Sequence, residues 1–320
     1  VCMESPFDAR QLRASLQPFE KAEGLAFSSQ VEAYLDFYGI DFANQYDGLQ
    51  HRIGYFDAAN YRVVMQSFCP SNPKGTVFVF HGYYDHVGIF GHVVRYAIEQ
   101  GYAVVAYDLP GHGLSSGPTA TIGSFSEYQV VLKTSIELIK GKFPEPWYAI
   151  AQSTGAAVMI EYLLGGQLNE DTSPFKKIAM LAPLVRPAQW VLTWCLYQVV
   201  RHFRDYIERK FAVNTSDQKF LRFLQEDDPL QSKQVSSRFV GAMIEYVARV
   251  KEYDRVSLSP LVIQGDSDET VDFQYNIPLL RQKFTNLNVA TVKGGQHQLA
   301  NESELLRKII FGHITQYFDA

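Results

Sequence analysis

Residues 151–155, with the sequence Ala-Gln-Ser-Thr-Gly, place a serine between two small residues where the predicted backbone turns from strand to helix. An apolar run at 147–150 precedes this segment, and an apolar helical stretch at 156–160 follows it. A serine on such a tight turn holds its hydroxyl out at the top of a sheet, and small neighbours let strand and helix approach closely. The pattern therefore predicts that Ser153 is a nucleophile.

A serine hydroxyl needs a base to take its proton and a carboxylate to orient that base. Asp266 and Asp268 follow the apolar run at 261–264, and His297 follows the run at 289–293. Serine, acid, histidine is one of the known chain orders for such a triad, and loops after strands commonly carry catalytic groups. We favour Asp268 as the acid because it leaves the loop more room beyond the strand, and Asp266 is the alternative.

Each of these signals has a simpler explanation when it is taken alone. A lone small-x-Ser-x-Gly segment is a weak signal, and an aspartate-rich loop after a strand is usually a solvated turn. A histidine near the C-terminus is usually a surface residue or a hydrogen-bonded core residue. The three together, in one order and each at a predicted strand end, favour catalysis.

An oxyanion hole is the next requirement, because charge develops on the carbonyl oxygen during such a reaction. The predicted strand at 75–80 ends at His81 and Gly82. The backbone N–H of Tyr83 could then join that of Thr154 as the two donors. His81 has a second interpretation as a hydrogen-bonding core residue that fixes this loop, and the two interpretations are compatible.

Other reaction classes lack their signals in this chain. His86, His92 and His112 do not have the spacing of metal ligands, so we predict no metal. The glycine-containing loops lack the dinucleotide and phosphate-loop patterns, so we predict no cofactor. Asp108 is typical of a turn or cap residue. The formal net charge of −5 predicts no nucleic-acid partner.

The elements that must position these residues are short β-rich runs alternating with helical patterns. This alternation predicts an α/β fold with a mostly parallel central sheet of about eight strands, flanked by helices on both faces. The predicted strands are 50–57, 61–69, 75–80, 102–107, 147–151, 177–181, 261–264 and 289–293. The predicted helices are 9–23, 29–38, 90–100, 124–140, 155–164, 273–283 and 302–318.

Three parts of the chain follow from this pattern. Residues 1–49 form a helical leader packed on the core, residues 50–186 and 256–320 form the core, and residues 187–255 form an inserted helical cap. The polar stretch 214–219 is interpreted as a mobile connection within the cap.

The cap has an apolar surface too wide for one helix to bury alone. One explanation is packing on the sheet or on other cap helices. The other is a lid over Ser153, whose inner face holds an acyl chain through Trp190, Trp194 and Tyr197. We expect these three to bind substrate, and we expect the cap to make transient contact with a membrane surface.

The composition is that of an ordinary globular protein. The chain has 320 residues, of which 47% are apolar and 14% aromatic, enough for a large core and an apolar pocket. No segment has the roughly 20 apolar residues that span a bilayer, and no signal-peptide pattern opens the chain. Cys2, Cys69 and Cys195 are few and far apart, which favours a reducing compartment. We therefore expect a cytoplasmic protein that can lie at the periphery of a membrane.

From about residue 50 to its end, the chain resembles the α/β-hydrolase family of monoacylglycerol lipases and bacterial lysophospholipases. The resemblance is carried by the elbow at 151–155 and by the segments 81–86, 107–116, 228–230, 264–268 and 294–297. It implies an α/β-hydrolase fold, a triad of Ser153, Asp268 and His297, oxyanion amides on Tyr83 and Thr154, and a lipid ester as substrate. The helical leader resembles the bacterial lysophospholipases more than it resembles the animal lipases.

The sequence also departs from this family. Ala151 replaces the first glycine of the elbow. The lipases that bind glycerol use an acidic residue, a basic residue and a second histidine. Here Asp85 keeps the acid, so we expect it to bind substrate, while Ile89 and Ala300 occupy the other two positions. The expected substrate is therefore the wider class of single-chain lipid esters, whether lysophospholipid or monoacylglycerol. The alternatives are a small ester, thioester or peptide, and a non-catalytic binding protein.

Overall fold

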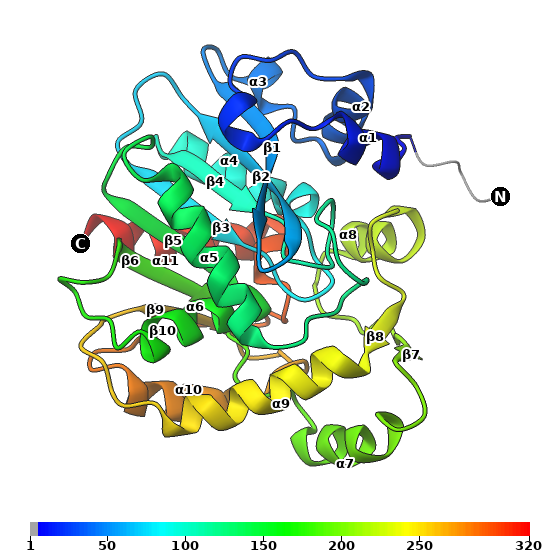
Figure 1. Ribbon diagram of the computed structural model, residues 1–320. Coiled ribbons are helices and arrows are strands. Elements are labelled where there is room, and N and C mark those ends of the chain that lie inside the picture. The colour runs from blue at the N-terminus through cyan, green and yellow to red at the C-terminus, as the bar shows by residue number, and fades with distance from the viewer. Residues whose placement is uncertain (1–5) are drawn as a thin grey trace.

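The computed structural model describes residues 6–320, and one eight-stranded sheet runs through this part of the chain (Figure 1). Its strand order is β1-β2-β4-β3-β5-β6-β9-β10. Strand β2 pairs antiparallel with β1 and β4, and the remaining neighbours are parallel. The strands are β1 Gln50–Ala58, β2 Tyr61–Cys69, β3 Thr76–Phe80, β4 Ala103–Tyr107, β5 Trp147–Gln152, β6 Phe175–Leu181, β9 Leu261–Gly265 and β10 Asn288–Val292.

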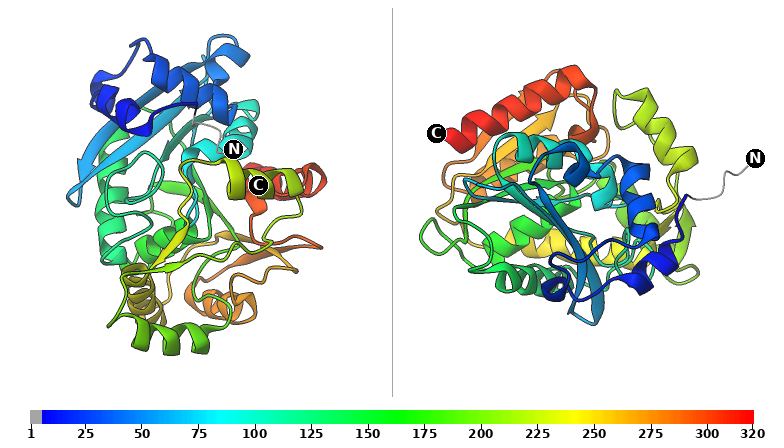
Figure 2. Two further views of the ribbon diagram at one scale, coloured as in Figure 1. Left: turned by 90° about the vertical axis from the view of Figure 1, so that its right-hand side faces the viewer. Right: turned by 90° about the horizontal axis from the view of Figure 1, so that it is seen from above.

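Helices cover both faces of this sheet (Figures 1 and 2). Helices α5, α6, α9 and α10 contribute to the apolar cluster on one face, and α4 and α11 contribute to the cluster on the other. The central strands β3, β4, β5 and β9 are buried at every position, as parallel strands between two helical layers must be. The helices are α4 Gly91–Glu99, α5 Phe125–Ile139, α6 Thr154–Gly165, α9 Ser237–Glu252, α10 Phe273–Lys283 and α11 Glu304–Asp319. The predicted α/β-hydrolase architecture is confirmed.

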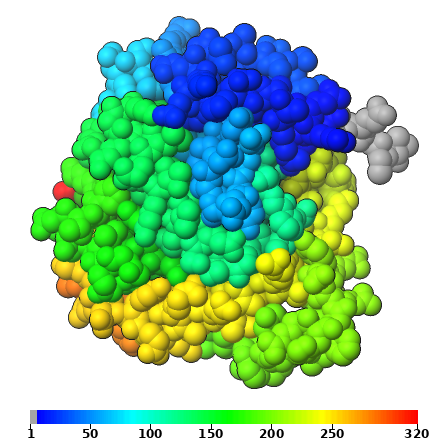
Figure 3. Space-filling view, in the orientation of Figure 1, coloured from blue at the N-terminus to red at the C-terminus, as the bar shows by residue number. Residues whose placement is uncertain are grey.

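The N-terminal segment packs on the face of α4 and α11, and it lies at the top of Figure 3. Its elements are α1 Ala9–Ser15, the 3₁₀ turn η1 Phe19–Lys21, α2 Ser29–Tyr38 and α3 Phe42–Gln45. The prediction of one helix over 9–23 is wrong. The first helix ends at Ser15, and Leu16 is extended. A helix cannot continue through Pro18, because proline has no N–H to donate and its ring would clash with the carbonyl group four residues earlier.

The segment between β6 and β9 contains more than helices. Helix α7 Trp190–Val200 is followed by β7 Tyr206–Glu208, α8 Gln218–Arg222, the π-helical turn η3 Phe223–Asp227 and β8 Gln234–Ser236. Strands β7 and β8 pair antiparallel, which the sequence analysis did not predict. Helix α9, placed in the cap by the sequence analysis, packs against α5 and α6. Helix α7 projects from the body at the lower right of Figure 3.

Among residues 6–320, no helix combines the length and the apolar character needed to cross a membrane.

Candidate active site

The turn between β5 and α6 holds Ser153 in an unusual backbone conformation. Its φ of 52° and ψ of −110° lie outside the regions that residues with a side chain normally adopt. A Cβ at Gly155 would lie 2.6 Å from the carbonyl oxygens of both Phe80 and His81. The elbow therefore needs glycine at this position, because β3 and the start of α6 touch there. Ala151, on the other side of the serine, is fully buried, so the structure accommodates its methyl group.

The structure brings the three predicted triad residues together. His297 Nε2 lies 2.9 Å from Ser153 Oγ, and His297 Nδ1 lies 2.9 Å from Asp268 Oδ2. All three residues are buried, each with less than 9% of its surface exposed. The imidazole can thus accept the serine proton on one nitrogen while the carboxylate holds the other, which is the arrangement that activates a hydroxyl.

The loop after β9 prepares Asp268 for this position. Its Oδ1 accepts hydrogen bonds from the amides of Thr270 at 2.8 Å and Val271 at 3.2 Å, and its Oδ2 accepts one from Gln264 Nε2 at 2.9 Å. Burial opposes the charge, but His297 and these donors hold the pKa of the Asp268 carboxyl below its ordinary value.

The rival acid points elsewhere. Asp266 is exposed, and its Oδ1 accepts hydrogen bonds from the Gly294 amide at 2.7 Å and from the Ser267 hydroxyl at 3.1 Å. Its carboxylate ties the β9 loop to the β10 loop, so the geometry favours Asp268 as the partner of His297.

The amides of Tyr83 and Thr154 border the same space. In the described chain neither amide donates to a protein acceptor, and both residues line the cavity at Ser153. A Cβ at Gly82 would lie 3.4 Å from the Ser153 Cβ, so glycine keeps this approach open. The two amides are thus available to a carbonyl oxygen placed next to Ser153.

Two buried polar side chains hold the loop that carries Tyr83. The His81 ring lies 2.8 Å from the Gly82 carbonyl oxygen through Nδ1, and its Nε2 accepts a hydrogen bond from the Leu109 amide at 2.9 Å. Asp108 accepts hydrogen bonds from the amides of Val87 and Leu114, each at 2.7 Å. His81 is thus a loop-fixing core residue, as one of its two interpretations predicted, and Asp108 is a turn residue as expected.

A cavity of about 260 Å³ opens at Ser153 and is called the active-site cavity below. Asp85 lines it and is 2% exposed, with Oδ2 accepting from the Gly82 amide at 3.2 Å and Oδ1 accepting from Gln298 Nε2 at 2.8 Å. Burial raises the pKa of the Asp85 carboxyl to about 6. The apolar side chains in the wall are Leu184, Pro187, Ala212, Val235, Phe239, Val240, Met243 and Val271.

The predicted substrate residues of α7 lie outside this cavity. Trp190 and Trp194 line a separate surface hollow with residues of α9, and Tyr197 packs against Gly241. Positions i, i+4 and i+7 share one helix face, and in α7 that face meets α9. Thr193, three residues after Trp190 and four before Tyr197, lies at the edge of this face and is the α7 residue in the cavity wall. The expectation that the three aromatic residues surround the substrate is therefore corrected for this structure.

The sequence analysis missed several residues of the cavity wall. Arg209 and Lys210 come from the stretch after β7, and Phe239 and Met243 come from one face of α9. The i, i+4 spacing of the two apolar residues could have identified a buried helix face, but not which surface it meets. No pattern in the sequence marks the two cations as neighbours of Ser153.

The polar stretch 214–219 is bound to the loop of the triad histidine. The Gln298 amide donates to the Asn214 carbonyl oxygen at 2.8 Å, and Thr215 Oγ1 donates to the Asn301 carbonyl oxygen at 2.8 Å. The Ser216 amide donates to Glu302 Oε2 at 2.9 Å. These hydrogen bonds account for the polar residues of the segment, which the sequence analysis interpreted as a sign of a mobile connection.

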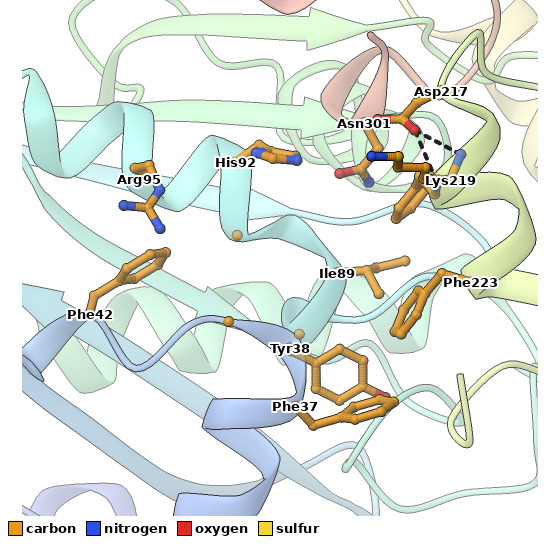
Figure 4. A pocket seen from close by; sticks show the side chains of 14 residues that line it. Phe37, Tyr38, Phe42, Ile89, His92, Arg95, Asp217, Lys219, Phe223 and Asn301 are labelled. Carbon is orange, nitrogen blue, oxygen red and sulfur yellow. Dashed lines mark hydrogen bonds between the residues drawn. The ribbon is translucent and has the colours of Figure 1, made fainter. Parts of the chain in front are cut away.

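A second pocket, of about 370 Å³, lies between α2, α4 and α8 (Figure 4). Phe37, Phe42 and Phe223 form part of its wall, together with His92 and Arg95. It shares no lining residue with the active-site cavity, so it takes no direct part in chemistry at Ser153.

Within residues 6–320, histidine, cysteine, aspartate and glutamate side chains do not form a group of three or more that could hold a metal ion.

Comparison with known proteins agrees with the fold. The protein family Hydrolase_4, described as serine aminopeptidase, S33, matches residues 71–304. A monoglyceride lipase homolog of monkeypox virus is 21% identical over 259 residues, which cover 76% of this chain and 88% of that protein. The monoglyceride lipase of Rattus norvegicus is 23% identical over 209 residues, which cover 62% of this chain and 67% of that protein.

Solved structures share the architecture. A soluble variant of monoglyceride lipase from Saccharomyces cerevisiae, in complex with a substrate analog, has a TM-score of 0.71 at 16% identity and covers 83% of this chain and 94% of its own. The monoacylglycerol lipase of Paleococcus ferrophilus has a TM-score of 0.67 at 19% identity and covers 80% and 97%. Because the family match spans well over half of the sequence, the chain belongs to the Hydrolase_4 family, and it is a serine hydrolase of the esterase and lipase type with the α/β-hydrolase fold.

Proposed function

We propose that the protein hydrolyses the acyl ester of a single-chain lipid, a lysophospholipid or a monoacylglycerol, through an acyl-enzyme. The observation that carries this proposal is the chain of two 2.9 Å contacts from Ser153 through His297 to Asp268. The apolar cavity wall and the names of the lipase relatives support a lipid as the source of the acyl group.

In the proposed reaction, His297 Nε2 takes the proton of Ser153 Oγ as the oxygen attacks the ester carbonyl carbon. The amides of Tyr83 and Thr154 donate to the carbonyl oxygen as it becomes negative. His297 then gives the proton to the departing alcohol, which leaves an acyl group on Ser153. A water molecule, deprotonated by His297, attacks this acyl group, releases the fatty acid and restores the serine. Asp268 orients and stabilises the imidazole throughout.

The first test is labelling with a fluorophosphonate probe, with and without a long-chain monoacyl lipid, followed by mapping of the adduct by mass spectrometry. We expect an adduct on Ser153 that the lipid prevents. The matched variant Ser153→Ala should keep its circular dichroism spectrum and lose both labelling and turnover. No labelling of the folded protein would favour a non-catalytic binding protein and would reject the mechanism.

One observation favours a second candidate, an esterase or thioesterase for short acyl groups or a peptidase. The cavity of about 260 Å³ is smaller than ligand pockets generally are, which run from about 300 to 1,000 Å³. The family description also names an aminopeptidase. Rates on esters of increasing acyl length distinguish the candidates: a maximum at acetyl or butyryl supports the second, and a rise toward long chains supports the lipid hydrolase.

The projecting face of α7 supports a further part of the proposal, transient contact of a cytoplasmic enzyme with a membrane surface. On α7, Val191 is 73% exposed, and Leu192, Leu196 and Val199 are also exposed. Phe203, three residues beyond the end of the helix, is 80% exposed. Exposed apolar patches of this kind mark sites of interaction with proteins or membranes. Co-sedimentation with phosphatidylcholine vesicles tests it: the double variant Val191→Ser and Phe203→Ser should bind less while its rate on a soluble ester stays unchanged. Equal binding of variant and parent would contradict membrane contact through this face.

A further inference from the structure

Arg209 is a half-buried cation in the wall of the active-site cavity. Its Nη1 donates to Gln231 Oε1 at 2.7 Å and to the Ser232 carbonyl oxygen at 3.1 Å. Its guanidinium carbon lies 3.8 Å from the centre of the Tyr84 ring and 4.2 Å from that of Phe211. Two acceptors and two rings thus fix the group in place, so little side-chain freedom remains to be lost when it binds a ligand.

The fixed guanidinium of Arg209 has hydrogen-bond donors that are not used within the protein. Both of its recorded acceptors are neutral and both bond to Nη1, so in the described chain Nε and Nη2 have no protein partner and no carboxylate lies within ion-pair distance. Lys210 lines the same cavity and also forms no ion pair in residues 6–320. Among the described residues, Asp85 is the one carboxyl of the wall, and Gly82 and Gln298 donate hydrogen bonds to it. The cavity therefore carries two cations and one carboxyl.

The chemistry that matches this wall is a phosphate or a carboxylate. The planar fork of an arginine donates to two oxygens of such a group at once, and hydrogen bonds between ionised partners are about twice as strong as neutral ones. Glycerol alone has neutral hydroxyls and does not need a cation. A neutral monoacylglycerol therefore does not explain the positive charge that Arg209 and Lys210 give to the cavity wall.

The position of Arg209 indicates which end of a substrate it meets. It stacks on Tyr84, the residue next to the amide that we propose as an oxyanion donor. An anion bound there lies near the ester and not at the far end of an acyl chain. The apolar side chains of Phe239, Val240 and Met243 on α9 remain available to the acyl chain.

We infer that the preferred substrate is a single-chain ester whose alcohol part carries a phosphate or carboxylate, which Arg209 binds with Lys210 beside it. The inference rests on the proposed ester hydrolase function and narrows its substrate class to esters with an anionic head group.

The test compares kcat/KM on three octanoyl esters below their micelle concentrations: octanoylglycerol phosphate, the octanoyl ester of hydroxybutyrate, and neutral octanoylglycerol. We expect the wild-type enzyme to prefer at least one anionic ester, and which one it prefers distinguishes phosphate from carboxylate. Arg209→Gln should lower the ratio of that ester to the neutral ester by about 10- to 100-fold, the range expected for a lost hydrogen-bonded charge. Arg209→Lys, which keeps the charge without the fork, should fall between Arg209→Gln and the wild type.

The matched control is Arg204→Gln, the same change at an exposed position outside the cavity wall. It should keep the wild-type ratio. A wild-type enzyme with no preference, or an Arg209→Gln ratio equal to that of Arg204→Gln, would overturn the inference. A glyceryl monoester of octanedioic acid places the anion at the acyl end, and a preference for it over octanoylglycerol phosphate would overturn the assignment to the alcohol part.

Binding separates this inference from the proposed reaction. In Ser153→Ala, titration calorimetry should give tighter binding of octyl phosphate than of octanol, and the difference should shrink when Arg209→Gln is added. If the difference persists with Arg209→Gln, or is absent from Ser153→Ala alone, the anion site is rejected. If it is present while the wild-type enzyme cleaves no ester and takes no probe at Ser153, the anion site stands and the hydrolase proposal fails.

Discussion

At the scale of single residues, two aspartates only two positions apart have different roles because they have different hydrogen-bond partners. Asp268 reaches His297 Nδ1 at 2.9 Å, whereas Asp266 accepts from the Gly294 amide at 2.7 Å. Only the first can hold the imidazole in the tautomer that accepts the serine proton.

Asp268→Asn should therefore lower kcat by about 10⁴-fold, because an amide no longer selects the correct tautomer or stabilises the imidazolium. The matched change Asp266→Asn should stay within a few fold of the parent, because it loses only a loop contact. Both rates are measured on a soluble chromogenic ester. Should Asp266→Asn turn out to be the damaging change, the acid of the triad has been assigned to the wrong residue.

A second residue-scale consequence concerns Asp85, whose pKa burial raises from 3.8 to about 6. The folded state then binds more protons than the unfolded state between these values, so the contribution of Asp85 to the free energy of unfolding falls as the pH rises from about 4 to about 6. A shift of this size corresponds to about 3 kcal/mol.

Asp85→Asn removes this titration but also changes the hydrogen bonds from Gly82 and Gln298. The test therefore uses how the free energy of unfolding changes with pH, and not the difference in stability at any one pH. Relative to the parent, the stability of Asp85→Asn in urea should increase between pH 4 and pH 6.5. The control Asp254→Asn, at an exposed position, should keep the slope of the parent. Parallel pH profiles for Asp85→Asn and the parent would refute the raised pKa.

At the scale of elements, the joint between β5 and α6 determines where the nucleophile stands. Helix α6 begins in contact with the end of β3. This contact explains both the positive φ of Ser153 and the lack of space at Gly155, where an added Cβ would lie 2.6 Å from two carbonyl oxygens. A side chain at Gly155 must move either the helix or the strand.

Gly155→Ala should therefore destabilise the fold by about 1–3 kcal/mol, as overpacking generally does, and should slow fluorophosphonate labelling of Ser153. Gly312→Ala is the matched control, because its Cβ meets no atom within 4 Å and it lies on α11. This control should be neutral or more stable by up to about 1 kcal/mol, since alanine favours a helix. Urea unfolding measures both variants, and equal stabilities would show that the elbow has room to spare.

The elements that the sequence could predict are those whose signals are local. Helix α2 was predicted with the bounds that the structure has, because the Ser28 side chain accepts from the Val31 amide at its start and Gly39 has a φ of 64° at its end. The buried strands were predicted within one or two residues, because a parallel strand between two layers is apolar throughout.

The rest of the site depends on contacts between distant segments. Helix α7 is apolar on every side, so periodicity could not tell that Trp190 and Trp194 meet α9 while Thr193 meets the cavity. Strands β7 and β8 have three residues each and exist because they pair across a gap of 25 residues. The place of Arg209 beside Ser153 follows from that pairing, which no local pattern reveals.

At the scale of the whole molecule, one buried network joins three segments that lie far apart in the sequence. Tyr38 at the end of α2 donates through its hydroxyl to Asp228 Oδ1 at 2.7 Å. The Nε2 of His86, from the loop after β3, lies 3.0 Å from Asp228 Oδ2. The side chains of His86 and Asp228 have no exposed surface, so helix α2, the loop after β3 and the segment after η3 depend on one another through a buried pair that water does not reach.

This network should make stability depend on pH in a predictable direction. Burial disfavours the charged form of both residues, but each charge stabilises the other. Asp228 therefore raises the pKa of His86. His86 and the Tyr38 hydroxyl lower the pKa of Asp228. A histidine with a raised pKa contributes its full stability below about pH 6.5, its unfolded value, and loses it as the pH rises through the raised value. Asp228 loses its contribution only in acid, as the pH falls through its lowered value.

A double-mutant cycle of His86→Gln and Asp228→Asn, measured by urea unfolding at intervals from pH 6 upward, tests this dependence. We expect a coupling free energy of about 1–3 kcal/mol at pH 6 that decreases as the pH rises through the raised pKa of His86, because the neutral imidazole keeps a hydrogen bond but not the charge. The exposed pair Glu304 and Lys308 on α11 is the control and should show no such change, because water screens it. A coupling that stays constant until the protein unfolds in alkali would contradict a contribution from the charge on His86.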